Sequence, residues 1–422
     1  MLVWPDKQAL LVKSRNPDKI LNVLPNAKSI TVKGVPLVAV PHRINETRLL
    51  RNLGYNAPAP IRTYYDWPGR FKPFQAQKEA AAFLSMHTRA FNLSELGTGK
   101  SLASLWAYDY LRSIGLLNKA LVISPLSTLE RTWADELFNH FPHLTFGVLH
   151  GPKKKRVAML KEDYDVYIVN HDGVGILEPY LKTRTDIDLV IVDEIAQCAR
   201  NAGTTKWKMI NSVVNRHKEP RACWGMSGTP TPNAPTDAWA QCKLLVPDQV
   251  PPYFGRFKAT VMRQITQFKW IPKPDATETV RKIMQPAVRF TRDECLDLPP
   301  IMFETRAVPL TKEQNKAYKE MVAKLRIQAD EGDITAVNEA VKMGKLVQIA
   351  CGVVYASDGT EVTIPATPRV EETRSIVHSA QGKVIVFVPY VSSVTMVADE
   401  LRKDFSVEVI HGGVKKDERD RI

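Results

Sequence analysis

The sequence lacks the marks of several protein classes. No apolar run reaches the roughly 18–20 residues of a membrane span, and residues 1–7 have no signal-peptide pattern. Repeats and low-complexity tracts are also missing. The cysteines are odd in number and far apart, without a C-x-x-C pair, which excludes a disulfide framework and a cysteine zinc site. We expect reduced core thiols of an intracellular protein at Cys198, Cys223, Cys242, Cys295 and Cys351.

Acidic residues are scarce relative to basic ones. The 422 residues include 58 Lys or Arg and 45 Asp or Glu, so the net charge is +13. Residues 1–70 hold 11 of the basic and 4 of the acidic residues, a net +7, which leaves +6 for the rest of the chain. This excess of basic residues favours a polyanionic partner but does not identify which one. The hydrophobic content of 44% is ordinary for a globular protein, and the length predicts roughly two to four domains.

The order of apolar and polar stretches predicts an α/β protein that begins with a small, basic α+β module. The module is expected at residues 1–66, with strands at 9–12 and 29–40 and helices at 18–24 and 44–53. Three prolines shortly after residue 56 interrupt every periodicity and mark its end.

Residues 67–250 are expected to form a parallel sheet covered by helices. The runs 120–123, 167–169 and 189–192 are apolar on both faces and are separated by helical segments, as such a sheet requires. A helical connector is expected at 251–375, where Thr311 and Gln314 have the spacing of a capping box.

The last segment, residues 376–422, predicts the start of a second α/β lobe. Its first strand is expected in the apolar run 384–388.

A glycine-rich segment follows the apolar residues 91–93 and precedes a helix-like stretch. Its sequence is Gly97-Thr98-Gly99-Lys100-Ser101. Glycines let backbone N–H groups converge on phosphate oxygens, and a helix N-terminus adds partial positive charge. Lys100 would reach the β- and γ-phosphates of a nucleotide, and Ser101 would ligate Mg²⁺. The full phosphate-loop pattern has Gly where Ser94 stands, so a glycine turn with an exposed lysine stays open as the alternative.

Two acids, Asp193 and Glu194, directly follow the apolar run 189–192. Parallel sheets bind ligands at the carboxyl ends of their strands. Asp193 would hold Mg²⁺ through water, and Glu194 would orient and deprotonate an attacking water. Taken alone, two acids after a strand are more often a solvated helix start, but the pairing with Lys100 favours the functional interpretation.

The order of these motifs resembles the Swi/Snf type of superfamily-two helicase-like ATPases, from about Phe71 to the end of the sequence. Residues 95–101 resemble motif I, which in this family also lacks the first glycine. Residues 71–75 look like the adenine-recognition motif, which implies that Gln75 contacts the base. Asp193 and Glu194 fall in motif II, where the family usually has His in place of Ala196. The implied fold is a RecA-like lobe of the P-loop NTPase type plus a partial second RecA-like lobe.

Residues 225–233 resemble motif III and its family-specific extension. The resemblance implies that Ser227, Gly228 and Thr229 couple the nucleotide to the DNA face. Residues 384–388 resemble motif IV, whereas motifs V and VI, with their arginine fingers, have no counterpart. We therefore expect a motor cut within its second lobe, which binds ATP and DNA but hydrolyses ATP slowly.

The resemblance also implies DNA contacts at strand ends and before the second lobe. For each single arginine among them, a surface charge cluster is an equally good interpretation. The basic run 153–156 looks like a nuclear-localisation signal, but we interpret it as a surface turn between a strand and a helix. The implied DNA-binding residues are Ser124, Pro125 and Thr128 of motif Ia, His171 of motif Ib, and Arg200, Arg289 and Arg292.

The function that the resemblance implies is an ATP-driven translocase. It would bind ATP and Mg²⁺ between two lobes and track the backbone of double-stranded or branched DNA, so that binding is salt-sensitive and independent of sequence. Two alternatives stay open: a helicase that separates or reanneals strands, and a nucleotide-gated DNA-binding module with little turnover. Few insertions favour a bacterial or viral source and a cytoplasmic location, with the nucleus as the alternative. The sequence leaves the oligomeric state and the preferred DNA structure open.

Overall fold

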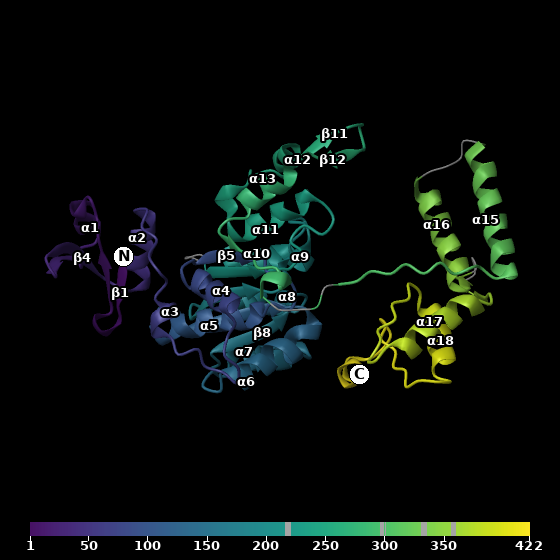
Figure 1. Cartoon of the computed structure of the whole chain (residues 1–422), viewed down its shortest axis with the longest axis horizontal. Coiled ribbons are helices and arrows are strands. Elements are labelled where there is room, and N and C mark those ends of the chain that lie inside the picture. Colours follow the sequence, from purple (N-terminus) through teal and green to yellow (C-terminus); the bar gives the residue numbers. More distant parts are fainter. Residues whose placement is uncertain (216–220, 296–298, 300, 331–335, 356–359) are drawn as a thin grey trace. The chain divides into compact units, whose positions relative to one another are not determined.

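The computed structural model describes residues 1–215, 221–295, 299, 301–330, 336–355 and 360–422. The chain divides into two units, Met1–Pro299 and Pro300–Ile422. Figure 1 shows the helices and strands of both.

The first unit begins with a four-stranded antiparallel sheet in the order β1-β2-β4-β3. Strands β3 and β4 join at Lys33 and Gly34, whose φ angles of 50° and 78° suit a two-residue hairpin turn. With two helices around a small core of their own, these elements form the expected α+β module. The sequence predicted all of them except β1. The elements are β1 (Leu2–Trp4), β2 (Ala9–Val12), α1 (Pro17–Val23), β3 (Lys28–Val32), β4 (Val35–Pro41) and α2 (Ile44–Asn52).

The module is packed against the larger part of the same unit. Ile44 of α2 and Ile61 of α3 (Ile61–Tyr64) belong to the core of the neighbouring helices rather than to the module's own core. Arg48 donates hydrogen bonds from Nε to the carbonyl oxygen of Met86 (2.9 Å) and from Nη2 to that of Ser85 (3.3 Å). These carbonyls lie at the C-terminal end of α4 (Gln75–Ser85), where a cation is favourable.

The centre of the first unit is a seven-stranded sheet in the order β13-β5-β10-β9-β6-β8-β7. Every neighbouring pair is parallel. Three of its buried strands contain the runs 120–123, 167–169 and 189–192, so the predicted parallel sheet is confirmed. The strands are β5 (Arg89–Asn92), β6 (Lys119–Ser124), β7 (Phe146–Val148), β8 (Val166–Asn170), β9 (Ile187–Val192), β10 (Ala222–Met226) and β13 (Ala287–Val288).

Helices cover both faces of this sheet, because alternate strand residues point to opposite sides (Figure 1). Val122 and Ile191 pack with the helices of one face, whereas Ile123 and Val192 pack with those of the other. The remaining helices of the unit are α5 (Lys100–Ser113), α6 (Asp135–His140), α7 (Lys153–Lys161), α8 (Val174–Leu181), α9 (Ile195–Cys198), α10 (Thr205–Asn215), α11 (Ala238–Leu245), α12 (Phe254–Val261), α13 (Ala276–Ile283) and α14 (Arg292–Cys295). Short helical turns lie at η1 (Pro5–Lys7), η2 (Leu126–Thr128), η3 (Leu129–Ala134), η4 (Pro235–Asp237) and η5 (Pro247–Gln249).

The boundary between the units differs from the expected one at 250/251. Phe257 and Val261 of α12 and Val280 of α13 are buried in the same core as the sheet. Between these helices lies a hairpin of β11 (Met262–Gln264) and β12 (Trp270–Pro272). The first part of the expected connector therefore belongs to the first unit, because its apolar side chains complete that core.

The basic run 153–156 is not the surface turn that we expected. It forms the first turn of α7, and Arg156 is buried. The Arg156 guanidinium donates to the carbonyl oxygen of Gly151 (2.7 Å) and to Oδ1 of Asn170 (3.0 Å). It therefore links the segment between β7 and α7 to the end of β8.

The second unit consists of helices and one small hairpin. The predicted capping box is confirmed: the Thr311 N–H donates to Gln314 Oε1, and the Gln314 N–H donates to Thr311 Oγ1, each at 3.1 Å. The elements are α15 (Lys312–Asp330), α16 (Ala336–Cys351), β14 (Val353–Tyr355), β15 (Glu361–Thr363), α17 (Thr367–Ser379), α18 (Val391–Leu401) and α19 (Lys416–Arg421).

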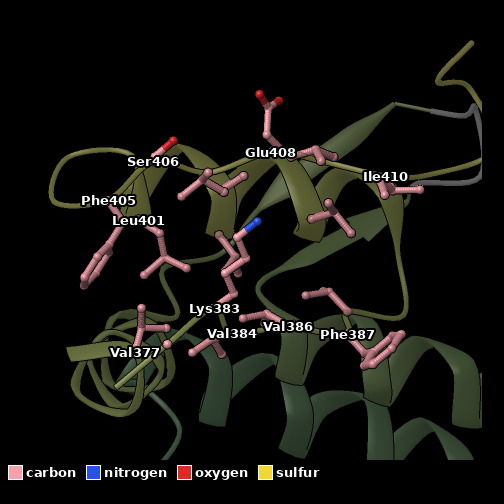
Figure 2. A pocket seen from close by; sticks show the side chains of 17 residues that line it. Val377, Lys383, Val384, Val386, Phe387, Leu401, Phe405, Ser406, Glu408 and Ile410 are labelled. Carbon is pink, nitrogen blue, oxygen red and sulfur yellow. The ribbon is translucent and has the colours of Figure 1, made fainter. Parts of the chain in front are cut away.

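The strand predicted at residues 384–388 is not formed. The segment is extended but unpaired, and Phe387 is 92% exposed. Figure 2 shows Val384, Val386 and Phe387 on one side of a cavity of about 390 Å³, opposite the extended residues 406–410. A strand needs a neighbour for its N–H and C=O groups, and the described part of this unit pairs only β14 with β15. The apolar run alone was therefore insufficient to predict a strand.

All five cysteines carry free thiols. Four are buried, as expected, and Cys295 is partly exposed. Burial raises the pKa of the Cys198, Cys223 and Cys242 thiols to about 12, so these groups are un-ionised core side chains. Within the described ranges, every helix is too short or too polar to cross a lipid bilayer.

Candidate functional site

The glycine-rich segment forms a turn between β5 and the N-terminus of α5. Gly97 and Gly99 have φ angles of 82° and 76°, in the left-handed region that favours glycine. Lys100 Nζ donates to the carbonyl oxygen of Glu95 (3.0 Å), as does Thr98 Oγ1 (2.8 Å). Ser101 follows in the first turn of the 14-residue helix. The structure therefore brings the predicted phosphate-binding residues together around one helix N-terminus.

Gln77 of α4 lies directly against this turn, although we did not predict a role for it. Its Oε1 accepts a hydrogen bond from the Phe74 N–H (2.8 Å), and its side chain is 7% exposed. A Cβ atom added to Gly99 would lie 1.9 Å from Gln77 Nε2. Gln75, the residue expected on the base, is exposed and donates to Glu79 Oε1 (3.0 Å). The signal that could have identified Gln77 is its spacing of three residues from Phe74, at the start of a helix.

Asp193 lies at the carboxyl end of β9, almost fully buried. Its Oδ2 accepts a hydrogen bond from Trp133 Nε1 (3.0 Å), and its Oδ1 accepts one from the Glu194 N–H (3.0 Å). Trp133 is a second site residue that we did not predict from the sequence. The two donors fix the orientation of the carboxylate.

Burial governs the ionisation of the three central groups. It lowers the pKa of the Lys100 ammonium and raises the pKa of the Asp193 carboxyl. The pKa of the Glu194 carboxyl is also raised, first by burial and then by the negative charge of Asp193. A carboxylate with a raised proton affinity is a better general base.

The segment after β10 connects these two parts of the site. Ser227 Oγ lies 3.5 Å from Glu194 Oε2, and the Thr229 N–H donates to Ser227 Oγ (3.3 Å). A Cβ atom on Gly228 would lie 3.3 Å from the backbone nitrogen of Leu96, so this glycine packs closely on the phosphate-loop segment. Of the three residues predicted to couple the site, Ser227 thus contacts the acid, Gly228 packs on the loop, and Thr229 contacts Ser227.

The residues expected to bind DNA fall into a buried and an exposed group. Ser124 and His171 are buried; the His171 N–H donates to the Ser124 carbonyl oxygen (3.1 Å), and His171 Nε2 donates to the Asp193 carbonyl oxygen (2.8 Å). Burial lowers the pKa of the His171 imidazole, which favours its neutral form. Pro125 and Thr128 are partly exposed just beyond β6.

The three arginines lie at two places. Arg289 Nη2 contacts Glu95 Oε1 (3.4 Å), and the Arg292 N–H donates to Glu95 Oε2 (3.1 Å), so both border the phosphate loop. Arg200 lines a separate open hollow of about 780 Å³, together with Trp239 and Phe254.

The side chains of the site fit a magnesium-bound nucleotide. Ser101 and Asp193 offer the hydroxyl and carboxylate oxygens that Mg²⁺ prefers. Among the described residues there is no cluster of three or more His, Cys, Asp or Glu side chains that could hold a metal alone.

Comparison with known proteins agrees with this arrangement. Residues 76–351 match the SNF2-related domain family. The chain belongs to this family. Its SNF2-related domain includes the seven-stranded parallel sheet of the first unit.

Several individual proteins are similar to this SNF2-type chain. Protein p41 of Acyrthosiphon pisum secondary endosymbiont phage 1 is 26% identical over 309 residues, which are 68% of this chain and 65% of p41. YwqA of Bacillus subtilis, named as an ATP-dependent helicase/translocase, is 22% identical over 345 residues, 78% of this chain and 36% of YwqA. The chain thus spans less than two thirds of either relative. A solved SWI2/SNF2 ATPase core of Sulfolobus solfataricus with double-stranded DNA is 23% identical, with a TM-score of 0.47, over 84% of this chain and 75% of that one.

Proposed function

We propose that this chain binds ATP with Mg²⁺ and uses ATP hydrolysis to move along DNA. The observation that carries the proposal is the hydrogen bond that Ser227 Oγ donates to Glu194 Oε2 (3.5 Å). It joins the acid that would activate water to a segment that packs on the phosphate loop through Gly228. A change of nucleotide would thereby reach Ser227 and Thr229, and from them the DNA-facing surface.

The triphosphate would be held by the loop itself. The backbone N–H groups from Gly97 to Ser101 would donate to phosphate oxygens, and the Lys100 ammonium would exchange its contact with the Glu95 carbonyl for one with phosphate. Mg²⁺, held by Ser101 and by Asp193 through water, would neutralise phosphate charge when bound. We retain Gln75 as the residue for the base, since its side chain is exposed whereas Gln77 is occupied by the loop.

Glu194 is the proposed general base. It would orient the attacking water and accept its proton, and its raised pKa favours proton acceptance. Trp133 and the Glu194 N–H keep the neighbouring Asp193 carboxylate oriented while the proton moves.

Contacts with DNA are proposed along the phosphates. Arg200, Arg289 and Arg292 can donate to phosphate oxygens from the surface, as can the partly exposed Thr128. Ser124 and His171 are buried, so their proposed role is to support the sheet edge that carries Pro125 and Asp193.

The test compares two substitutions in the full-length protein. Lys100→Ala should abolish binding of a fluorescent ATP analogue, because the loop loses its only side-chain ammonium. Glu194→Gln should keep that binding and lower DNA-stimulated phosphate release by roughly 10²–10⁴-fold, the usual contribution of a general base. Displacement of a triplex strand measures movement and should be lost in both variants.

Lys161→Ala and Glu162→Gln make the same chemical changes at neighbouring exposed positions and serve as controls. Unchanged DNA-stimulated hydrolysis in Lys100→Ala or Glu194→Gln would contradict the assignment. ATP turnover without triplex displacement would reduce the function to a DNA-dependent ATPase that does not translocate.

A further inference from the structure

The hairpin of β11 and β12 is not used by the proposed ATPase site. Its strands pair Met262 with Pro272 and Gln264 with Trp270. The turn is closed by hydrogen bonds from the Ile265 N–H to the Lys269 carbonyl oxygen (2.8 Å) and from the Lys269 N–H to Thr266 Oγ1 (3.1 Å). In Figure 1 it lies at the outer end of α12, away from the sheet. The turn is thus held by its own contacts and presents its middle residues outward.

Phe268 is one of these middle residues and is 90% exposed. Ile265 on the same turn is 52% exposed. A large aromatic side chain in water at the tip of an ordered turn loses the free energy that burial would provide. A single exposed aromatic needs no explanation by itself, so the surroundings of Phe268 decide what it could bind.

The hairpin and the helix α12 that precedes it are basic. Residues 254–273 contain five Lys or Arg residues and no Asp or Glu. Arg263 and Lys269 are exposed on the hairpin itself, one on each side of the tip. The others are Arg256, Lys258 and Lys273. An acidic partner is therefore favoured over a neutral apolar one.

The base of the hairpin is anchored, unlike its tip. Met262 is buried in the core of the first unit, and Trp270 packs against that core. Lys258 Nζ lies 4.1 Å from the centre of the Trp270 ring, and Lys273 Nζ donates to the Ala259 carbonyl oxygen (2.6 Å). A force on the tip would therefore be transmitted to the sheet that carries the ATPase residues.

We propose that this hairpin is a wedge for the junction between double-stranded and single-stranded DNA. Phe268 stacks on the first unpaired base, while Arg263 and Lys269 contact the flanking phosphates. Every base has an aromatic face and every nucleotide a phosphate, so the contact is independent of sequence. The inference rests on the proposed DNA motor and extends it from tracking a duplex to recognising a branch.

The neighbouring surface supports a nucleic-acid path. Phe254, in the same helix as Lys258, is 44% exposed and packs edge-on against Trp239, with ring centroids 5.5 Å apart. Both residues line the hollow that contains Arg200. The hairpin and the hollow are therefore joined through α12, and one strand could follow the two in succession.

The test is Phe268→Ala in the 422-residue chain, measured on a forked duplex with 2-aminopurine at the first unpaired position. The wild type should bind the fork more tightly than a blunt duplex and change the 2-aminopurine emission. Phe268→Ala should weaken fork binding by roughly 5- to 150-fold, the range expected for one stacked base, and lose the emission change. Phe268→Trp should retain both.

The matched control is Phe138→Ala, which removes an aromatic ring that is 74% exposed on α6. It should bind the fork like the wild type. An unchanged fork preference in Phe268→Ala overturns the wedge, as does an equal loss on fork and blunt duplex, which would make the hairpin a general phosphate contact. If the wild type binds no DNA of either kind, the proposed function itself fails, and blunt-duplex binding distinguishes the two failures.

Discussion

At the residue scale, the site combines ionisable side chains that affect one another's charge with a strained backbone conformation. Lys100, Asp193 and Glu194 are close enough in a buried environment for their charges to alter each other's pKa. Glu194 also has a φ of +46°, a strained conformation for a side chain of this size. Such strain persists only where the surroundings impose it, here the buried end of β9 and the contact with Ser227.

Gly99 and Gln77 provide a test of the loop geometry. Gly99→Ala should weaken ATP-analogue binding strongly, since the new Cβ would meet Gln77 Nε2 at 1.9 Å and φ is +76°. Gly97→Ala has comparable backbone strain but no atom within 4 Å of its Cβ, so its loss should be smaller. The double variant Gln77→Ala/Gly99→Ala should recover part of the binding. Additive losses in the double variant would show that the clash is not what Gly99 avoids.

The central site residues were predictable from sequence, but their supports were not. Lys100 and the pair Asp193–Glu194 follow apolar strands at recognisable spacings, so local pattern was sufficient. The contacts of Gln77 with Gly99 and of Trp133 with Asp193 join residues 22 and 60 positions apart. They depend on how helices pack on the sheet, which no local spacing encodes.

At the scale of elements, helix α2 attaches the basic module to the rest of the first unit. The Arg48 guanidinium caps the end of α4 with two hydrogen bonds to backbone carbonyls. Burial lowers the pKa of this guanidinium, which reflects the cost of removing it from water. The hydrogen bonds must offset that cost for the contact to stabilise the fold.

Arg48→Met should therefore lower the free energy of unfolding of the first unit by about 1–3 kcal/mol, because two carbonyls lose a charged donor. The measurement is a denaturant titration followed by tryptophan fluorescence. Arg43→Met, an exposed arginine of the same module, is the control and should shift the midpoint little. Equal stabilities of the two variants would contradict a structural role for Arg48.

Elements were predicted well where the chain itself satisfies their backbone groups. The capping box at Thr311 and the helix over residues 44–53 are local, and both were confirmed. The run 384–388 has the composition of a buried strand, yet it stays unpaired, because strand formation depends on a neighbour and not only on composition.

At the scale of the whole molecule, the uneven charge suggests that the basic module contributes to DNA affinity. The triple variant Lys13→Gln/Arg15→Gln/Lys19→Gln removes three exposed cations from it. The slope of log affinity against log salt for a blunt duplex should become shallower by up to about 2.7, since each phosphate contact contributes about 0.9.

The control, Lys312→Gln/Lys316→Gln/Lys319→Gln, removes the same charge from exposed positions of α15. A change in slope of the same size in this control would mean that net charge alone, and not the module, sets the salt dependence.

The overall architecture was predictable from alternating apolar runs, but its divisions were not. The parallel sheet follows from strands that are apolar on both faces. The first unit extends beyond residue 250 because Phe257 and Val280 are buried in its core, and the local sequence of these two residues resembles any amphipathic helix.

The placement of Ile44 and Ile61 has a practical consequence for dissecting the protein. Both side chains are fully or almost fully buried in the core of the lobe, although they lie at the end of the basic module. Deleting that module would expose a hydrophobic patch on the lobe, and the shortened protein would tend to aggregate. Loss of DNA binding after such a deletion would then report insolubility rather than a missing contact, so the module's role is better studied by substituting its exposed charged residues.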